Sequence, residues 1–318
     1  MNHKTLFFCG VLAVILSVIF CPDSAFADTN TAAAHPTEYD AGPLPKAGLE
    51  GAKFRWWSPA NTKIRGVLVL IPGRGGDGRG LVGDAAWQAL ATKTKFGIMG
   101  CFLANKKEDI GTYQHDPNGV VSELLNKAVN TLLAQNGQPI QNPPLAFWGH
   151  SAGSNVTECY ASHHAERVVA AVLLRGPNGP GSSTAGKEAV PILIYIGKKD
   201  KPEWIADSLK NYEKGHTAHA LWTLALNPNE GHEAGKTAAL TAVFLEEAIK
   251  LRLPPPATGL TALTAATPIR LSKSDGWLGD TTSLEIGSYS TFKGKQREAT
   301  WLLDEMTAKA WQAYLRGQ

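Results

Sequence analysis

Short apolar runs alternate with amphipathic patterns along the chain between residues 54 and 252. The run at residues 67–71 is rich in β-branched residues and closed by Pro72-Gly73, which is typical of a strand buried on both faces. Between such runs, apolar residues recur at helical spacing, as they do over residues 120–133. Strands that alternate with helices in this way predict βαβ units and a parallel sheet.

The apolar runs and the helical patterns predict a series of elements. A short strand at residues 54–57 precedes strands at 67–71, 96–103, 145–148, 168–174, 192–196 and 220–226. Helices are predicted at residues 81–93, 120–133, 152–163, 203–212 and 234–251. The predicted fold class is α/β, with a mostly parallel central sheet flanked by helices. Because the functional sites of such sheets lie beyond the carboxyl ends of the strands, we expect the reacting groups in the loops that follow them.

The N-terminus has the layout of a secretory signal peptide. A nearly unbroken apolar run from Leu6 to Phe20 follows Lys4, and Ala25-Phe26-Ala27 fits a small-x-small cleavage site. The run has about 15 residues, whereas ~20 are needed to span a bilayer. We therefore expect residues 1–27 to be removed on export to the periplasm or the extracellular space, with no stable membrane anchor left behind.

Proline positions suggest two further boundaries. Residues 28–50 are small and polar with three prolines, which predicts a flexible lead-in. Pro254-Pro255-Pro256 ends the last predicted helix, so the catalytic domain is predicted at residues 51–253. The remaining residues, 254–318, contain three tryptophans, which are unusual in a disordered segment. We expect a proline linker followed by a small C-terminal appendage packed on the core, with a contribution to the substrate cleft as the alternative.

Composition and charge exclude several classes of protein. With 43% hydrophobic and 19% charged residues, the chain can bury a large core. A net charge of +3, without a Lys/Arg run, gives no support for nucleic-acid binding. The sequence has no H-E-x-x-H pattern and no paired C-x-x-C, so neither a metal nor another cofactor is expected. The sequence does not indicate an oligomeric state.

Two cysteines, Cys101 and Cys159, remain after removal of the signal. An oxidising compartment would permit a disulfide between them. Free cysteines also pack as small buried hydrophobic side chains. We favour the second interpretation, because the sequence does not show that a predicted strand residue and a predicted helix residue meet.

The pentapeptide at residues 149–153, Gly-His-Ser-Ala-Gly, fits the G-x-S-x-G pattern of a nucleophile elbow. A predicted strand precedes it and a predicted helix follows it, which is the context that this motif requires. The turn lifts the Ser151 hydroxyl above the sheet edge, and the helix N-terminus favours negative charge that develops there. The alternative is a serine that only caps the helix. We predict that Ser151 is the nucleophile.

A serine nucleophile needs a base and an acid that orients the base. In this arrangement the chain order is serine, acid, histidine. Asp200 follows the strand at residues 192–196, and His232 lies in the loop after the strand at 220–226. Both positions fall on the same sheet edge as Ser151, so we predict His232 as the base and Asp200 as the acid.

Other acidic residues are weaker candidates for the orienting acid. Asp207 is the reserve, but it lies within a predicted helix. Glu230 and Glu233 flank His232, where they are placed less favourably for the far nitrogen of the imidazole. His150, beside the nucleophile, is expected to line the pocket.

A glycine-rich loop, Pro72 to Gly78, follows the first long strand. Acyl transfer requires backbone N–H groups that bind the oxyanion. Ala152 N–H is the expected first donor and Arg74 N–H the second, with Gly75 as the alternative donor and a further expected pocket residue. A phosphate-binding loop is disfavoured, because the Gly-Lys-Ser/Thr ending is absent.

These motifs together resemble the α/β-hydrolase superfamily over residues 54–252. The resemblance extends to bacterial secreted esterases related to feruloyl esterases, polyhydroxybutyrate depolymerases and dienelactone hydrolases. It implies a three-layer α/β-hydrolase fold and a serine esterase that forms an acyl-enzyme on a small-molecule or polymer-linked ester. The chain departs from many relatives in having Pro72-Gly73, where they carry His-Gly before the oxyanion residue. A peptidase or amidase with the same triad, and a binding protein without activity, remain alternatives.

Overall fold

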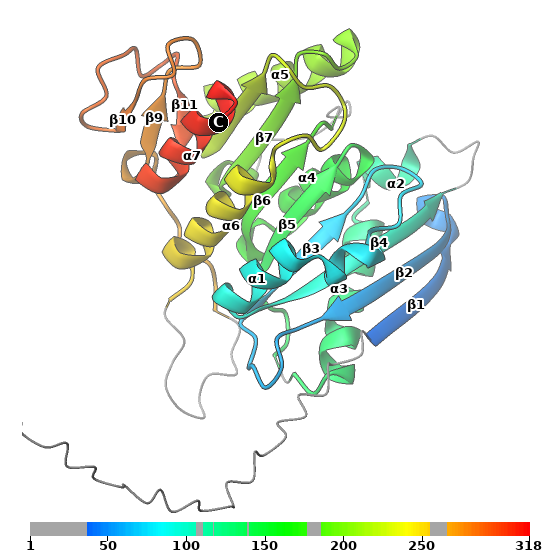
Figure 1. Cartoon of the computed structure of the whole chain (residues 1–318). Helices are drawn as coiled ribbons and strands as arrows, with labels where there is room; N and C mark the ends of the chain where they lie inside the picture. The colour runs from blue at the N-terminus through cyan, green and yellow to red at the C-terminus, as the bar shows by residue number, and fades with distance from the viewer. Residues whose placement is uncertain (1–36, 106–110, 117, 139, 177–185, 255–265) are drawn as a thin grey trace, which may run out of the picture. The chain divides into compact units, whose positions relative to one another are not determined.

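A computed structural model describes residues 37–105, 111–116, 118–138, 140–176, 186–254 and 266–318 (Figure 1). The predicted signal peptide, residues 1–27, lies outside the described residues. So do the first part of the predicted lead-in and most of the proline linker.

The described residues form a central eight-stranded sheet with the order β1-β2-β4-β3-β5-β6-β7-β8. Its strands are β1 (Thr37–Leu44), β2 (Leu49–Trp57), β3 (Gly66–Ile71), β4 (Phe96–Asn105), β5 (Leu145–His150), β6 (Val168–Leu174), β7 (Ile192–Gly197) and β8 (Trp222–Asn227). The helices are α1 (Ala85–Thr94), α2 (Thr112–His115), α3 (Val120–Gln135), α4 (Ala152–His163), α5 (Pro202–Thr217), α6 (Ala238–Arg252) and α7 (Glu305–Arg316). A small second sheet, in the order β10-β9-β11, consists of β9 (Trp277–Gly279), β10 (Ile286–Ser288) and β11 (Thr300–Leu302).

The direction of the strands confirms the predicted fold class. Strands β3 to β8 run parallel to their neighbours, whereas β1 and β2 form an antiparallel extension next to β4. The carboxyl ends of β3, β5, β7 and β8 therefore open onto the same edge of the sheet. The loops that carry the predicted site residues all leave from this edge.

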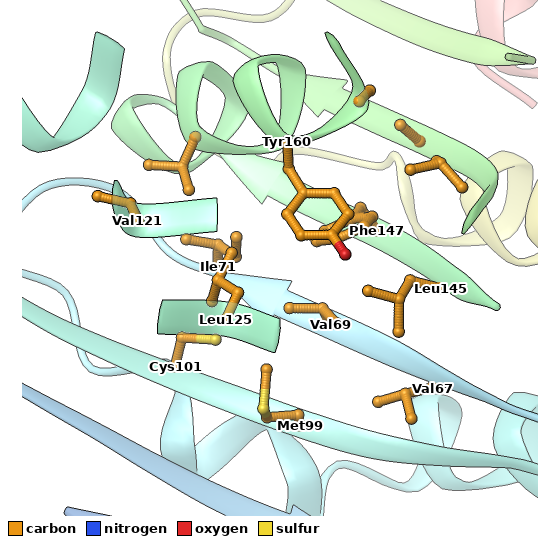
Figure 2. Close-up of a cluster of buried hydrophobic side chains, with 14 of the residues drawn as sticks. Val67, Val69, Ile71, Met99, Cys101, Val121, Leu125, Leu145, Phe147 and Tyr160 are labelled. Carbon is orange, nitrogen blue, oxygen red and sulfur yellow. The ribbon is translucent and has the colours of Figure 1, made fainter. Parts of the chain in front are cut away.

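Side chains of the parallel strands fill two cores, one on each face of the sheet. In β3, Val67, Val69 and Ile71 belong to one core, and Leu68 and Leu70 belong to the other. This alternation explains why the run is apolar at every position. Figure 2 shows the first core, where α3 and α4 cover the sheet. Helices α1, α6 and α7 cover the second core, so the fold has three layers.

The predicted flexible lead-in was wrong from residue 37 onward, because residues 37–44 form β1, residues 45–47 form a 3-10 turn, and β2 begins at Leu49. The edge strand β1 pairs with β2, and the ring of Tyr39 stacks on Phe54 with centroids 6.1 Å apart. Pro43 is compatible with an edge strand, which leaves backbone N–H groups unpaired on one side. Gly42 has a φ of 70°, and the register shifts around it. Turn-forming residues in an irregular edge strand therefore suggested a loop.

The first helix also begins later than predicted. Its predicted start at residue 81 falls in a 3-10 turn, and α1 begins at Ala85. The side chain of Asp84 accepts the backbone N–H groups of Ala86 and Trp87 at 2.9 and 3.1 Å. This N-cap fixes the start of the helix.

The C-terminal segment, residues 266–318, belongs to the same compact unit as the sheet. It provides hydrogen-bond partners for the backbone of the edge strand β8, whose outer side has no strand neighbour in the central sheet. The Leu224 N–H donates to Thr300 Oγ1 at 2.7 Å, and the Trp311 indole N–H donates to the Leu224 carbonyl at 2.7 Å. Side chains thus bind the backbone N–H and carbonyl groups of Leu224, with which a further strand would otherwise pair.

Trp311 is expected to be essential for the stability of this segment, because it is completely buried and binds the sheet edge. Trp311→Ala should lower the free energy of unfolding by about 3–5 kcal/mol. Trp311→Phe keeps most of the ring and should lose only about 1–3 kcal/mol for the unsatisfied carbonyl. Urea unfolding measures both, and equal losses in the two variants would contradict this interpretation.

Candidate active site

Ser151 stands in a sharp turn between the end of β5 and the start of α4. Its φ of 52° and ψ of −119° are rarely adopted by a residue with a side chain. A Cβ at Gly153 would collide with the carbonyl group of Ile71, and a Cβ at Gly149 would collide with the backbone of Gly153. A residue with a side chain therefore does not fit at either glycine of the motif. The packing around Ser151 stabilises its strained backbone conformation.

Ser151 occupies the position of a helix cap but makes no capping hydrogen bond with its side chain. Its hydroxyl oxygen lies 2.9 Å from His232 Nε2, and His232 Nδ1 lies 2.7 Å from Asp200 Oδ2. A carboxylate can only accept, so Nδ1 carries the proton and Nε2 accepts from the hydroxyl. The structure therefore brings the three predicted residues into one chain of hydrogen bonds, in the tautomer that a general base needs.

The Asp200 carboxylate is held on both of its oxygens. Its side chain is 6% exposed, and Oδ1 accepts the backbone N–H of Lys201 at 2.8 Å. In the loop after β7, the Lys198 N–H donates to the carbonyl of Asn227 at the end of β8, and the Lys199 N–H donates to the Glu230 carbonyl in the loop that carries His232. This link between the two loops fixes the acid relative to the histidine.

The other acidic candidates do not face the imidazole. Asp207 is exposed on α5. Glu230 contacts Arg175 and Tyr314 instead, and Glu233 accepts the backbone N–H of Gly231.

The two predicted oxyanion donors lie next to Ser151. Ala152 is the first residue of α4, where backbone N–H groups have no partner within the helix. Arg74 and Gly73 border the same pocket, and a Cβ on Gly73 would stand 3.2 Å from the Cβ of Ser151. The loop after β3 therefore passes directly beside the hydroxyl.

Gly75, expected to line the pocket, does not do so. The Gly76 N–H donates to the Gly73 carbonyl at 2.9 Å, which closes a tight turn over residues 73–76. Gly75 takes the third position of this turn with a φ of 72° and points to solvent. Its glycine serves the turn geometry rather than the pocket.

No protein-family model and no curated protein matches the sequence. Among solved structures, a ferulic acid esterase aligns with a TM-score of 0.50 at 10% identity, over 68% of this chain and 97% of that chain. The chain has the α/β-hydrolase fold.

Further solved structures align less closely. The poly(3-hydroxybutyrate) depolymerase LpqC from Bordetella parapertussis aligns with a TM-score of 0.49 at 17% identity, over 66% of this chain and 88% of that chain. An arylesterase aligns with a TM-score of 0.48 at 10% identity, over 68% of this chain and 84% of that chain.

In this α/β-hydrolase fold, the hydroxyl faces a cavity of about 430 Å³. The cavity is lined by Gly73, Arg74, Gln114, His150, Ser151, Ala152, Trp204 and His232. Two of these residues, Gln114 and Trp204, were not predicted from the sequence. The ring of Trp204 lies 4.6 Å from that of His232, and the Lys201 ammonium lies 4.2 Å from the Trp204 ring. The position of Trp204, four residues after Asp200 and at the start of the next helix, was the signal that could have identified this residue.

His150 lines the pocket as expected and also contacts the histidine loop, which we define as residues 228–237. Burial lowers the pKa of His150, which favours the neutral ring. A carbonyl can only accept, so His150 Nε2–H donates to the His232 carbonyl at 2.8 Å. The residue beside Ser151 thus holds the backbone of His232.

The two cysteines are free thiols, so the interpretation without a disulfide is confirmed. Cys101 is completely buried in β4, and burial raises its thiol pKa. Burial raises the pKa of Cys159 to about 12. Neither thiol is therefore a reactive thiolate at neutral pH.

Across the described ranges, no group of three or more His, Cys, Asp or Glu side chains could hold a metal ion. In that same part of the chain, no helix has the length and apolar character needed to cross a membrane.

Proposed function

We propose that this chain is a serine hydrolase that cleaves carboxylic esters through an acyl-enzyme intermediate. One observation carries the proposal: the continuous hydrogen-bonded series from Asp200 through His232 to Ser151 at the wall of a pocket. A serine with only a structural role would need neither the strained turn nor an imidazole within hydrogen-bond distance of its hydroxyl.

In the proposed reaction, the Ser151 hydroxyl attacks the ester carbonyl and gives its proton to His232 Nε2. Asp200 stabilises the imidazolium that forms and keeps the ring in place. The N–H groups of Ala152 and Arg74 bind the oxyanion, and one such donor is worth about 3 kcal/mol of barrier. The imidazolium then protonates the leaving alcohol, and water activated by His232 cleaves the acyl-enzyme.

The pocket agrees with a small ester or with one ester unit of a polymer. Its volume of about 430 Å³ lies within the range of roughly 300–1,000 Å³ common for small-molecule sites. The ferulic acid esterase with this fold acts on an ester by its name, which also favours ester cleavage. We further propose export after cleavage near Ala27, on the strength of the N-terminal pattern.

Active-site labelling tests this proposal. A fluorophosphonate probe should label the purified protein, and mass spectrometry should place the adduct on the peptide that contains Ser151. Ser151→Ala should abolish the label. A labelled Ser151→Ala variant, or an unlabelled wild-type protein, would count against the assignment.

Rates on matched p-nitrophenyl esters and aminoacyl p-nitroanilides then test the ester preference. Faster cleavage of the anilides would point to the peptidase alternative. A panel of short acyl, feruloyl, sugar-acetyl and polyester substrates resolves the acyl and alcohol parts.

A further inference from the structure

A buried carboxylate stands two residues before His232 in the histidine loop. Glu230 is 8% exposed, and a buried carboxylate is costly unless it is paired and hydrogen-bonded. Its Oε1 accepts the Lys236 backbone N–H at 2.9 Å, and its Oε2 accepts the Tyr314 hydroxyl at 2.5 Å. The guanidinium of Arg175 forms an ion pair with the same Oε2. These three partners hold the loop around the carboxylate.

The loop closes tightly around this carboxylate. Gly235 has a φ of 58°, and a Cβ at this position would collide with the carboxylate of Glu230. Arg175 Nε also points to the Glu233 carbonyl at 3.4 Å. His232 therefore lies between two residues that contact the same buried arginine.

The Tyr314 hydroxyl reaches this loop from the last helix of the chain. Tyr314 is 5% exposed, and its ring packs edge-on against Tyr195 with centroids 5.2 Å apart. Burial and the hydrogen bond to Glu230 raise the pKa of Tyr314 to about 12, so the phenol keeps its proton and donates. Because Trp311 ties α7 to β8, the donor and the strand that leads into the loop belong to one packed group.

We propose that Tyr314 is a positioning residue for the active site, which holds the histidine loop through Glu230 and thereby sets the distance from His232 to Ser151. The inference rests on the proposed role of His232 as the general base. Misplacement of a reacting group by about 1 Å can cost ~10²-fold in rate. The C-terminal segment thus contributes to turnover without lining the pocket.

Tyr314→Phe tests this role, because it removes the hydroxyl and keeps the ring. With p-nitrophenyl acetate as the probe, we expect kcat to fall about 10-fold and KM to stay within about twofold, since the pocket walls are unchanged. Tyr160→Phe is the matched control. It removes another buried hydroxyl, which donates to Asn126 Oδ1 on α3 at 2.6 Å and not to a residue of the loop. This control should keep kcat within about twofold, with both variants assayed well below their melting temperatures.

Glu230→Gln provides a second variant, which keeps the shape of the side chain but removes its charge. It should lower kcat at least as much as Tyr314→Phe, and the double variant should be no slower than Glu230→Gln, because both act through one contact. Wild-type kcat in Tyr314→Phe, or losses that multiply in the double variant, would overturn the inference. Ser151→Ala is measured alongside. If it keeps activity, the proposed function fails; if it is inactive while Tyr314→Phe is unaffected, only the positioning role fails.

Discussion

Ser151→Ala is expected to lower kcat by up to ~10⁶ while KM changes little, because the hydroxyl is the proposed attacking group and the pocket walls remain. His232→Ala should cost a similar amount, and the double variant should be scarcely slower than either single variant, since the two residues act as one unit. Residual catalysis would come from the oxyanion donors and from binding. Initial rates on a p-nitrophenyl ester at high enzyme concentration measure these losses.

Ser162→Ala is the matched control on the same helix. The Ser162 hydroxyl donates to the carbonyl of Glu158 at 3.0 Å, so its removal should leave kcat within about twofold. A Ser151→Ala variant that retains more than about a tenth of wild-type kcat would exclude Ser151 as the nucleophile.

Asp200→Asn should lower kcat by about 10⁴, the loss found when a triad carboxylate becomes an amide. The amide cannot stabilise the imidazolium, and its NH2 group favours the tautomer with the proton on Nε2, which cannot accept from Ser151. Asp207→Asn is the control, because Asp207 is exposed on the following helix. It should keep kcat within about twofold. A large loss in Asp207→Asn together with near-normal Asp200→Asn would reverse the choice of acid.

The parts of the fold that were predictable depend on local pattern. The apolar run at residues 67–71 became β3 because side chains on both faces are buried. The three residues of the hydrogen-bonded series were predictable from the glycine motif and from loop positions after strands. Parallel strands bring such loops to one edge, so sequence order alone indicated their proximity.

Other features depend on contacts between distant segments, which leave little local trace. Tyr314 donates to Glu230 across 84 residues, and no periodicity links the two. Trp204 could be assigned to a helix, but only the placement of α5 brings its ring to His232. The edge strand β1 was missed because its proline and glycine resemble a loop, although the pairing with β2 orders it.

The side chains of Thr300 and Trp311 bind the backbone N–H and carbonyl of Leu224, and these contacts affect how the chain behaves in solution. Side chains, unlike a ninth strand, end the sheet without offering a new row of backbone donors and acceptors. A proteolytic fragment that ended before this segment would expose that row together with the apolar surface beneath it. We expect such a fragment to recruit strands from other chains and residues 266–318 to limit self-association in the intact protein.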